Sequence, residues 1–177
     1  PKEYGGHGLS ALHRYVVTEE LLASGAPLRA HWIADRQVGP GLLKFGSEFQ
    51  KRELLPRIAA GKCYFCVGLS EPNAGSDLAS MKTRAVQAEG GWVVNGRKIW
   101  TSIGHRAHYM NLLARTGSDA DDRRGGVTQF LLDMKTPGVT VRPIINMLGE
   151  HDFNEVEFDN VFIPDQWVVG TVGNAWN

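Results

Sequence analysis

The segment Trp92-Val93-Val94-Asn95-Gly96-Arg97-Lys98-Ile99-Trp100-Thr101-Ser102 decides the class of fold. Two stretches of strand length, Trp92–Asn95 and Arg97–Thr101, meet at the dipeptide Asn95-Gly96. Asparagine and glycine both tolerate the positive φ angles of a type I′ turn, so this pair predicts a two-residue β-hairpin. The segment is therefore expected to form two antiparallel strands.

Further strand candidates lie on both sides of this hairpin. The compact apolar run Cys63–Leu69 has the length of a buried strand. Residues 83–88 are expected to join the strand at Trp92 around Glu89-Gly90-Gly91. Many short strands at such spacing predict a small antiparallel barrel or sandwich. The remaining strand candidates are 109–114, 127–133, 139–143 and 155–163.

The first third of the chain predicts helices instead. Ser10 precedes apolar residues near helical spacing, and Gly25 supplies a stop. Residues 28–45 are also expected to be mostly helical. Gly39-Pro40-Gly41 should break or kink this second helix, because proline removes a donor and clashes with the preceding turn.

A capping box marks the start of another helix. Ser47 is followed three residues later by Gln50, and this pair can satisfy the free amides at a helix start. The helix is expected to run toward Gly61, and Pro56 to restart it rather than continue it. Helices first and strands after them give the order of an α+β protein, not of alternating β and α elements.

Composition excludes several classes of protein. The chain has 177 residues, 19 Lys and Arg, 19 Asp and Glu, and a formal net charge of 0. A nucleic-acid-binding domain should carry a basic stripe, which this balance does not favour. A hydrophobic content of 42% is that of a globular chain with a core. No apolar run has the roughly 20 residues needed to span a bilayer, and no signal peptide is expected.

The two cysteines, Cys63 and Cys66, have a spacing that suggests a metal or redox site. A structural zinc site needs further ligands. His105 and His108 are the nearest other pair, and nothing in the spacing ties them to the cysteines. Two buried free thiols are therefore the favoured interpretation, with a reducing compartment.

Two segments carry residues suited to ligand binding. In Ser70-Glu71-Pro72-Asn73-Ala74-Gly75-Ser76-Asp77, small side chains would let a phosphate or a polar ring edge reach the backbone amides. By composition alone, a tight loop with Asx and Ser turns is the favoured explanation of this segment. In Trp100-Thr101-Ser102, the indole could pack against a flat aromatic ligand and the hydroxyls could hydrogen-bond its edge. Alternatively, Trp100 could be an ordinary core residue.

In sequence order, these segments and others resemble the acyl-CoA dehydrogenases, flavoproteins that oxidise acyl-CoA thioesters between Cα and Cβ. The segment Leu69 to Asp77 is similar to a signature of the family. The other matching segments are Pro1 to Ser10, Gly46 to Gly61, Lys82 to Ala85, Asn95 to Ser102, Ala114 to Thr116, Thr136 to Val139 and Val156 to Pro164.

The resemblance implies an α+β fold in which a helical N-terminal segment is followed by a small antiparallel β-barrel. Residues 1–62 would be part of the N-terminal helical domain and residues 63–168 the middle β-barrel domain. Residues 169–177 would start a linker to a C-terminal helical bundle that is missing from this chain. Ala175 stands where many members of the family carry glycine.

The resemblance also implies an FAD site. Leu69 and Ser70 would lie along the flavin ring and bond its pyrimidine edge. Trp100, Thr101 and Ser102 would line the flavin face, with the Ser102 hydroxyl near flavin N5. Two further cofactor-binding residues, Gly75 and Ser76, would sit at the pyrophosphate.

For the substrate, the resemblance implies acyl-CoA. Ser76 would also lie near the CoA thioester, and Arg124 could reach the CoA nucleotide or could be a solvated loop arginine. Ala30 and Ile33 are expected by position to line the acyl pocket. The neighbouring Asp35-Arg36 could instead face a polar or steroid-like acyl group.

The implied reaction removes a proton from Cα with a glutamate and transfers a hydride from Cβ to flavin N5, which gives a 2-enoyl-CoA. That glutamate lies in the C-terminal domain of most members, so no catalytic residue is nominated, and the 177 residues alone are expected to be inactive. Glu71 is instead expected to hold its loop. The alternatives are a flavin-dependent oxidase or monooxygenase on the same scaffold and a non-catalytic binding protein.

The expected partners follow the family as well. They are an acyl-CoA substrate, an electron-transfer flavoprotein and further copies of the full-length chain in a dimer or tetramer. No metal, nucleic acid or membrane span is expected. The expected location is the cytoplasm, or the mitochondrial matrix in a eukaryote.

Overall fold

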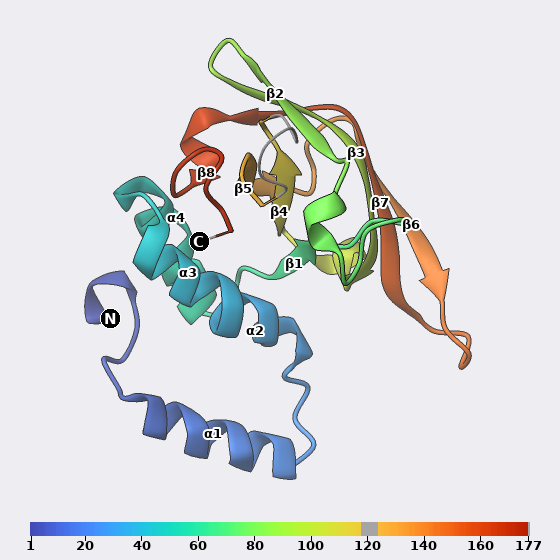
Figure 1. Ribbon diagram of the computed structural model, residues 1–177. Helices are drawn as coiled ribbons and strands as arrows, with labels where there is room; N and C mark the ends of the chain where they lie inside the picture. The colour runs from blue at the N-terminus through green and yellow to red at the C-terminus, as the bar shows by residue number, and fades with distance from the viewer. Residues whose placement is uncertain (118–123, 177) are drawn as a thin grey trace. The chain divides into compact units, whose positions relative to one another are not determined.

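The computed structural model describes residues 1–117 and 124–176, without the side chain of Ala30 (Figure 1). The chain forms two compact units, Pro1–Tyr64 and Phe65–Asn177. The helices expected in the first third lie in the first unit and the expected strands in the second. This is the α+β order that the sequence predicts.

The helical unit has a small core and a largely exposed first helix. Leu42, Leu54 and Ile58 are among its buried apolar residues. The first helix follows Ser10, as predicted, and none of its residues is buried. No helix among the described residues is long and apolar enough to cross a membrane. The α-helices of the unit are α1 (Ala11–Ala23), α2 (Arg29–Ile33), α3 (Gly39–Phe45) and α4 (Glu48–Ala59).

The predicted capping box is present at the start of α4. The Gln50 backbone N–H donates to Ser47 Oγ at 3.2 Å, and the Ser47 backbone N–H donates to Gln50 Oε1 at 3.1 Å. The prediction that Pro56 restarts this helix is wrong, since α4 continues through it. Pro56 lies near the end of the helix, so the one hydrogen bond that it removes leaves the earlier turns intact.

The Gly39-Pro40-Gly41 segment does not end the helical region, which continues to Phe45. Pro40 lies in the first turn of α3, where a missing N–H is tolerated. The irregularity comes just before it, as a π-helical stretch over Ala34–Val38 between α2 and α3. The expected break therefore takes the form of a local widening of the helix.

The strands of the second unit form one mostly antiparallel sheet in the order β6-β7-β3-β2-β4-β5-β8. The strand β1 pairs with β4 in parallel, off this path. In Figure 1 the long strands β3 and β7 run side by side, and their residue pairing is that of antiparallel strands. The strands are β1 (Phe65–Gly68), β2 (Arg84–Ala88), β3 (Gly91–Ser102), β4 (Tyr109–Arg115), β5 (Val127–Asp133), β6 (Val139–Ile145), β7 (His151–Pro164) and β8 (Val168–Val169).

The predicted hairpin at Asn95-Gly96 is wrong, because β3 runs unbroken through both residues. The pairing of β3 with β7 shifts register between Val94 and Gly96, which marks a bulge. Gly96 has φ 147°, and a Cβ there would lie only 2.6 Å from Thr83 Oγ1. The Asn95 side chain accepts the Asn160 backbone N–H at 2.9 Å. The dipeptide thus bends a long strand instead of reversing the chain.

The reversal occurs at Glu89-Gly90, between β2 and β3, where Ala88 pairs with Gly91. The segment around Glu89-Gly90-Gly91 was predicted as a connection, and the structure agrees. The expected loop or hairpin tip over 117–126 joins β4 to β5, and residues 118–123 of it lie outside the described part of the chain.

The sheet wraps around one apolar core. Cys66 is part of it, and burial raises the pKa of its thiol to about 12. Cys63 is buried too, and neither cysteine is in a disulfide, in agreement with the prediction of two buried thiols. Residues 168–174 pack against β5, since β8 pairs with it and Asn174 bridges to Val127. The largest apolar core residues are Trp92, Met110, Leu112, Phe130, Leu132, Phe158 and Ile163.

Candidate functional site

The loop that follows β1 is held by one buried carboxylate. Glu71 is only 8% exposed, and its side chain accepts the backbone N–H of Lys82 at 2.6 Å and that of Thr83 at 2.9 Å. Its backbone exchanges two hydrogen bonds with Ala74, which closes a tight turn. Glu71 therefore holds the loop, in the structural role that the sequence suggested for it.

Lys98 completes this arrangement from the middle of β3. Its fully buried ammonium donates to Glu71 Oε1 at 2.9 Å and to the Leu69 carbonyl at 2.9 Å. Burial lowers the pKa of Lys98, and the nearby carboxylate opposes that shift. Burial would raise the pKa of Glu71, but the Lys98 charge and the hydrogen bonds from Lys82 and Thr83 lower it below its usual range. The contact between Lys98 Nζ and Glu71 Oε1 is a buried ion pair.

These contacts bring together the two segments that the sequence singled out. The Ile99 backbone N–H donates to the Ser70 carbonyl at 2.9 Å, next to the Lys98 bond to Leu69. Residues 69–70 of the loop thus lie beside the residues that lead into Trp100. Two bonds from consecutive residues of β3 fix the base of the loop against that strand.

The tip of the loop is open. Gly75 and Ser76 are exposed, and a Cβ at Gly75 would have no heavy atom within 4 Å. After the tip, Arg115, 2% exposed, donates from its guanidinium to the carbonyls of Ala79 and Met81. The loop is therefore fixed at both ends and accessible between them.

The end of β3 forms a strained strap, Trp100–Ile103. Trp100 has φ 61° and Ile103 has φ 51°, both in the left-handed region that bulky side chains rarely adopt. The pairing with β7 shifts register between Lys98 and Thr101. As a result the Trp100 side chain is 58% exposed, and its ring meets the edge of Phe153 at a centroid distance of 6.1 Å. The alternative of an ordinary core tryptophan is wrong.

Next to this exposed ring lies an unsatisfied buried hydroxyl. Thr101 is 1% exposed, and its Oγ1 has no hydrogen-bond partner among the described residues. A buried polar atom without a partner costs free energy, and its usual explanation is a bound molecule or a functional role. Ser102, half-buried, follows on the same strand.

Three residues that the sequence did not single out hold the strap in place. Asn154 of β7 is fully buried and donates from its side chain to the Thr101 carbonyl at 2.9 Å. His105 and His151 contact the other side of the Asn154 amide, at 3.3 Å and 2.6 Å. The pairing of β3 with β7 brings Asn154 and His151 to the strap from a distant part of the chain, so local sequence gave no signal for them.

Arg124 lies apart from these contacts. It is exposed, and its guanidinium stands 5.9 Å from the ring centroid of Trp176. Its predicted contact with CoA stays a prediction.

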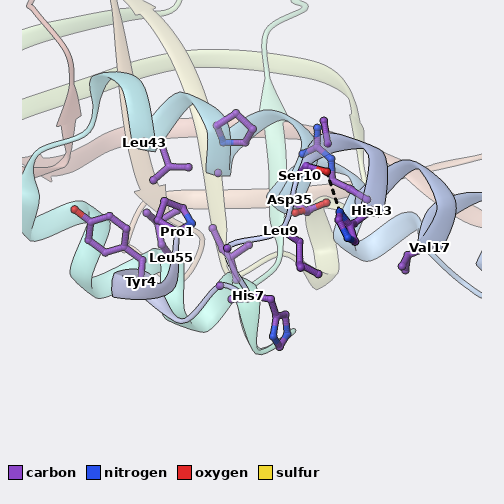
Figure 2. Close-up of a pocket in the computed structure, with 18 residues that line it drawn as sticks. Pro1, Tyr4, His7, Leu9, Ser10, His13, Val17, Asp35, Leu43 and Leu55 are labelled. Atoms are coloured by element: carbon purple, nitrogen blue, oxygen red, sulfur yellow. Dashed lines mark hydrogen bonds between the residues drawn. The ribbon is translucent and has the colours of Figure 1, made fainter.

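The helical unit has a cavity of its own, of about 550 Å³, drawn in Figure 2. Leu43, Leu55 and Val17 give it apolar walls, and the hydrogen-bonded pair Ser10 and His13 lies at 2.8 Å on its lining. None of the predicted flavin-binding residues lines it.

The residues expected at the acyl pocket all belong to the helical unit. Ile33 is buried, and Asp35 contributes to the lining of the cavity. Arg36 pairs with Asp35 at 3.3 Å and stands 5.3 Å from the ring centroid of Trp32. The side chain of Ala30 lies outside the described part of the structure. The predicted acyl-binding role of these residues stays a prediction.

The described residues contain no group of three or more His, Cys, Asp or Glu side chains that could hold a metal. The site thus consists of an open loop, an exposed indole and an orphaned hydroxyl. These groups suit a flat ligand with a polar rim and an anionic extension. They are typical of the class of protein that binds an organic cofactor or nucleotide.

Comparison with known families identifies that class further. Residues 1–62 match the family described as "Acyl-CoA dehydrogenase, N-terminal domain", and residues 66–161 match "Acyl-CoA dehydrogenase, middle domain". The chain belongs to the acyl-CoA dehydrogenase family.

Individual relatives agree. The acyl-CoA dehydrogenase FadE34 of Mycobacterium tuberculosis is 42% identical over 99% of the chain, which spans 24% of that protein. Among solved structures, the "Tcur3481-Tcur3483 steroid ACAD" superposes with a TM-score of 0.92 at 36% identity. The ChsE4–ChsE5 complex of M. tuberculosis gives 0.90 at 36%, and an FAD complex of PigA gives 0.84 at 30%. Each covers 99% of this chain, which spans 45–47% of theirs.

Proposed function

We propose that this chain provides one wall of the flavin and substrate site of an FAD-dependent acyl-CoA dehydrogenase. The observation that carries the proposal is the orphaned Thr101 hydroxyl beside the exposed, strained Trp100. Backbone strain persists where the surrounding structure imposes it, and it concentrates at functional sites. The membership of the family and the FAD complex of a related protein support the same conclusion.

The residues present fit a flavin. The Trp100 indole offers a flat apolar face, and the hydroxyls of Thr101 and Ser102 lie on the same strap. Leu69 and Ser70, at the base of the neighbouring loop, would lie along the ring. The open backbone at Gly75 and Ser76 would receive the negatively charged pyrophosphate, because small side chains let it approach the amides.

A bound FAD would supply the hydride acceptor for Cβ of the acyl chain. The chain described here positions the ring through Trp100 and excludes water from one of its faces. Hydroxyls at the ring edge stabilise negative charge that develops there. None of the described carboxylates is assigned as the base that removes the α-proton, and Glu71 in particular is occupied by Lys98 and two backbone amides.

The substrate class that we propose is an acyl-CoA, with Ser76 and Arg124 as contacts. A related structure is that of a steroid acyl-CoA dehydrogenase, which supports a bulky, ring-containing acyl group as the first candidate to test. Because another related structure is a complex of two proteins, we propose that the full-length protein works as an oligomer. Electron transfer to an electron-transfer flavoprotein and a cytoplasmic location are part of the same proposal.

The experiment is an anaerobic titration of the full-length protein with straight-chain and steroid acyl-CoA thioesters. The flavin absorption band should be present and should bleach on addition of at least one thioester, with slow reoxidation in air. A protein that contains flavin but bleaches with no acyl-CoA would refute the dehydrogenase function. Rapid reoxidation by oxygen would instead favour a flavin oxidase.

A further inference from the structure

The amide of Asn154 has only one possible orientation. One of its atoms lies 2.9 Å from the Thr101 carbonyl oxygen, which can only accept a hydrogen bond. The atom there must therefore be the Asn154 nitrogen, and the amide oxygen faces the opposite way. Since the side chain is fully buried between β3 and β7, it has no freedom to exchange these roles with water.

This orientation fixes the protons of two histidines. The Asn154 oxygen lies 2.6 Å from His151 Nε2 and 3.3 Å from His105 Nδ1. An amide oxygen only accepts, so both ring nitrogens must carry a hydrogen. The two imidazole rings also stack, with centroids 3.8 Å apart and planes 24° from parallel. The histidines thus hold the amide from one side while it holds the strap from the other.

The strap needs such support. Two of its residues, Trp100 and Ile103, have positive φ angles, and a backbone in this region persists only where its surroundings impose it. The Ile103 backbone N–H donates to the Asp152 carbonyl at 2.8 Å, one residue after His151. Gly104 passes so close that a Cβ there would lie 3.3 Å from Asn154 Nδ2. The histidine pair, Asn154 and the strap therefore form one packed network.

We propose that Asn154, oriented by His105 and His151, is a positioning residue that holds the Thr101–Ser102 segment in its flavin-facing geometry. The inference rests on the proposed function, because it assigns Thr101 and Ser102 to the flavin. Asn154 acts through the Thr101 carbonyl and does not itself touch the ligand.

The network has a built-in dependence on pH. Each histidine can hold its bond to Asn154 while neutral, but two protonated rings at 3.8 Å would repel each other. Burial and the neighbouring His151 lower the pKa of His105; Arg106 acts in the same direction, and Asp152 and the bond to Asn154 oppose it. A lowered pKa means that the stabilisation is present above the ordinary value of 6.5 and is lost as the pH falls through the native pKa.

Amide hydrogen exchange of residues 100–104 in the full-length protein tests the network without relying on flavin. Asn154→Ala and His151→Phe, which keeps a ring but loses the N–H, should each speed exchange of this segment roughly tenfold, as expected for a lost buried hydrogen bond. His151→Gln, whose amide can still donate, should restore protection. Asn111→Ala is the matched control, because it removes an amide bond to Gln129 elsewhere in the sheet. In the wild type, the protection factor of this segment, which is the intrinsic exchange rate at each pH divided by the measured rate, should fall below pH 6.5.

FAD affinity and the visible flavin spectrum give the second readout. Asn154→Ala should weaken FAD binding roughly tenfold and shift the spectrum, and Asn111→Ala should do neither. Wild-type protein that binds no FAD would refute the proposed function. Wild-type protein that binds FAD, with an Asn154→Ala variant of equal affinity and spectrum, would refute only the positioning role. Failure of His151→Gln to protect better than His151→Phe would also overturn it.

Discussion

The loop at Ser70–Asp77 and the strap at Trp100–Ile103 lie side by side but are stabilised in opposite ways. The loop is satisfied: its buried carboxylate has an ammonium and two backbone amides as partners. The strap is not, since it has two residues at positive φ and an orphaned hydroxyl. The polar groups of the loop thus stabilise one another, whereas we propose that the strap meets its partner in the bound flavin, so mutations in the two should separate stability from binding.

The largest effect is expected at Lys98. Lys98→Met removes the ammonium and leaves the Glu71 carboxylate buried without its counter-charge, which should cost about 3–5 kcal/mol of unfolding free energy. Chemical denaturation monitored by circular dichroism measures it. Arg97→Met is the matched control on the same strand, since its side chain is 47% exposed and its ion pairs contribute only about 0–1 kcal/mol. Equal losses for the two variants would contradict the structural role of the buried pair.

Lowering the pH should also reduce the free energy of unfolding, but by less than Lys98→Met does. The native pKa of Glu71 is lowered, so its stabilising contribution is complete above the ordinary value of 4.5 and is lost as the pH falls through the native pKa. Denaturation midpoints measured at successive pH values below neutrality should therefore decline more steeply in the wild type than in Glu71→Gln. Parallel curves for the two proteins would show that Glu71 does not contribute.

Two buried threonines provide a smaller and sharper test. Thr128 bonds the Thr116 hydroxyl at 2.7 Å and the Gly173 N–H at 2.8 Å, so Thr128→Val should cost about 1–3 kcal/mol. Thr101→Val removes an unpartnered hydroxyl, so the protein without FAD should change by about 0–1 kcal/mol. The same variant should weaken FAD binding roughly tenfold, and Thr101→Ser should retain it. A Thr101→Val protein that is destabilised as much as Thr128→Val, with unchanged FAD affinity, would remove the main support for the flavin site.

The smallest effect concerns the backbone of Trp100. Trp100→Gly should stabilise the protein without FAD by about 1 kcal/mol, because glycine adopts positive φ without strain. Trp100→Ala keeps the strain and should not gain, while both variants should bind FAD more weakly. Thermal unfolding without FAD distinguishes the two. A stability loss in Trp100→Gly would mean that the exposed ring, not the strain, dominates at this position.

The sequence predicted local structure correctly where a signal had one physical meaning. The capping box at Ser47 is one example, and the turn at Glu89-Gly90 is another. The hairpin prediction at Asn95-Gly96 was wrong because tolerance of positive φ suits a β-bulge as well as a hairpin turn. Only the pairing with β7 decides between the two. The prediction that Pro56 restarts its helix was wrong because a proline is better tolerated near the end of a helix than in its middle.

The candidate site was predicted only for the segments that carry a motif. Composition left both the loop and the strap open to ordinary explanations, and the resemblance to a family singled them out. Asn154, by contrast, contributes through the register of β3 with β7, 53 residues from Thr101 along the chain. Such a contact has no signature within either strand. The strain at Trp100 and Ile103 also follows from a register shift that no local pattern specifies.

The most direct test of the central claim is a crystal structure of the full-length protein with bound FAD. The isoalloxazine ring should lie against Trp100, with Thr101 and Ser102 along its edge and the pyrophosphate at Gly75 and Ser76. FAD bound elsewhere, for example in the cavity of the helical unit, with Trp100 exposed and the Thr101 hydroxyl still without a partner, would contradict the account.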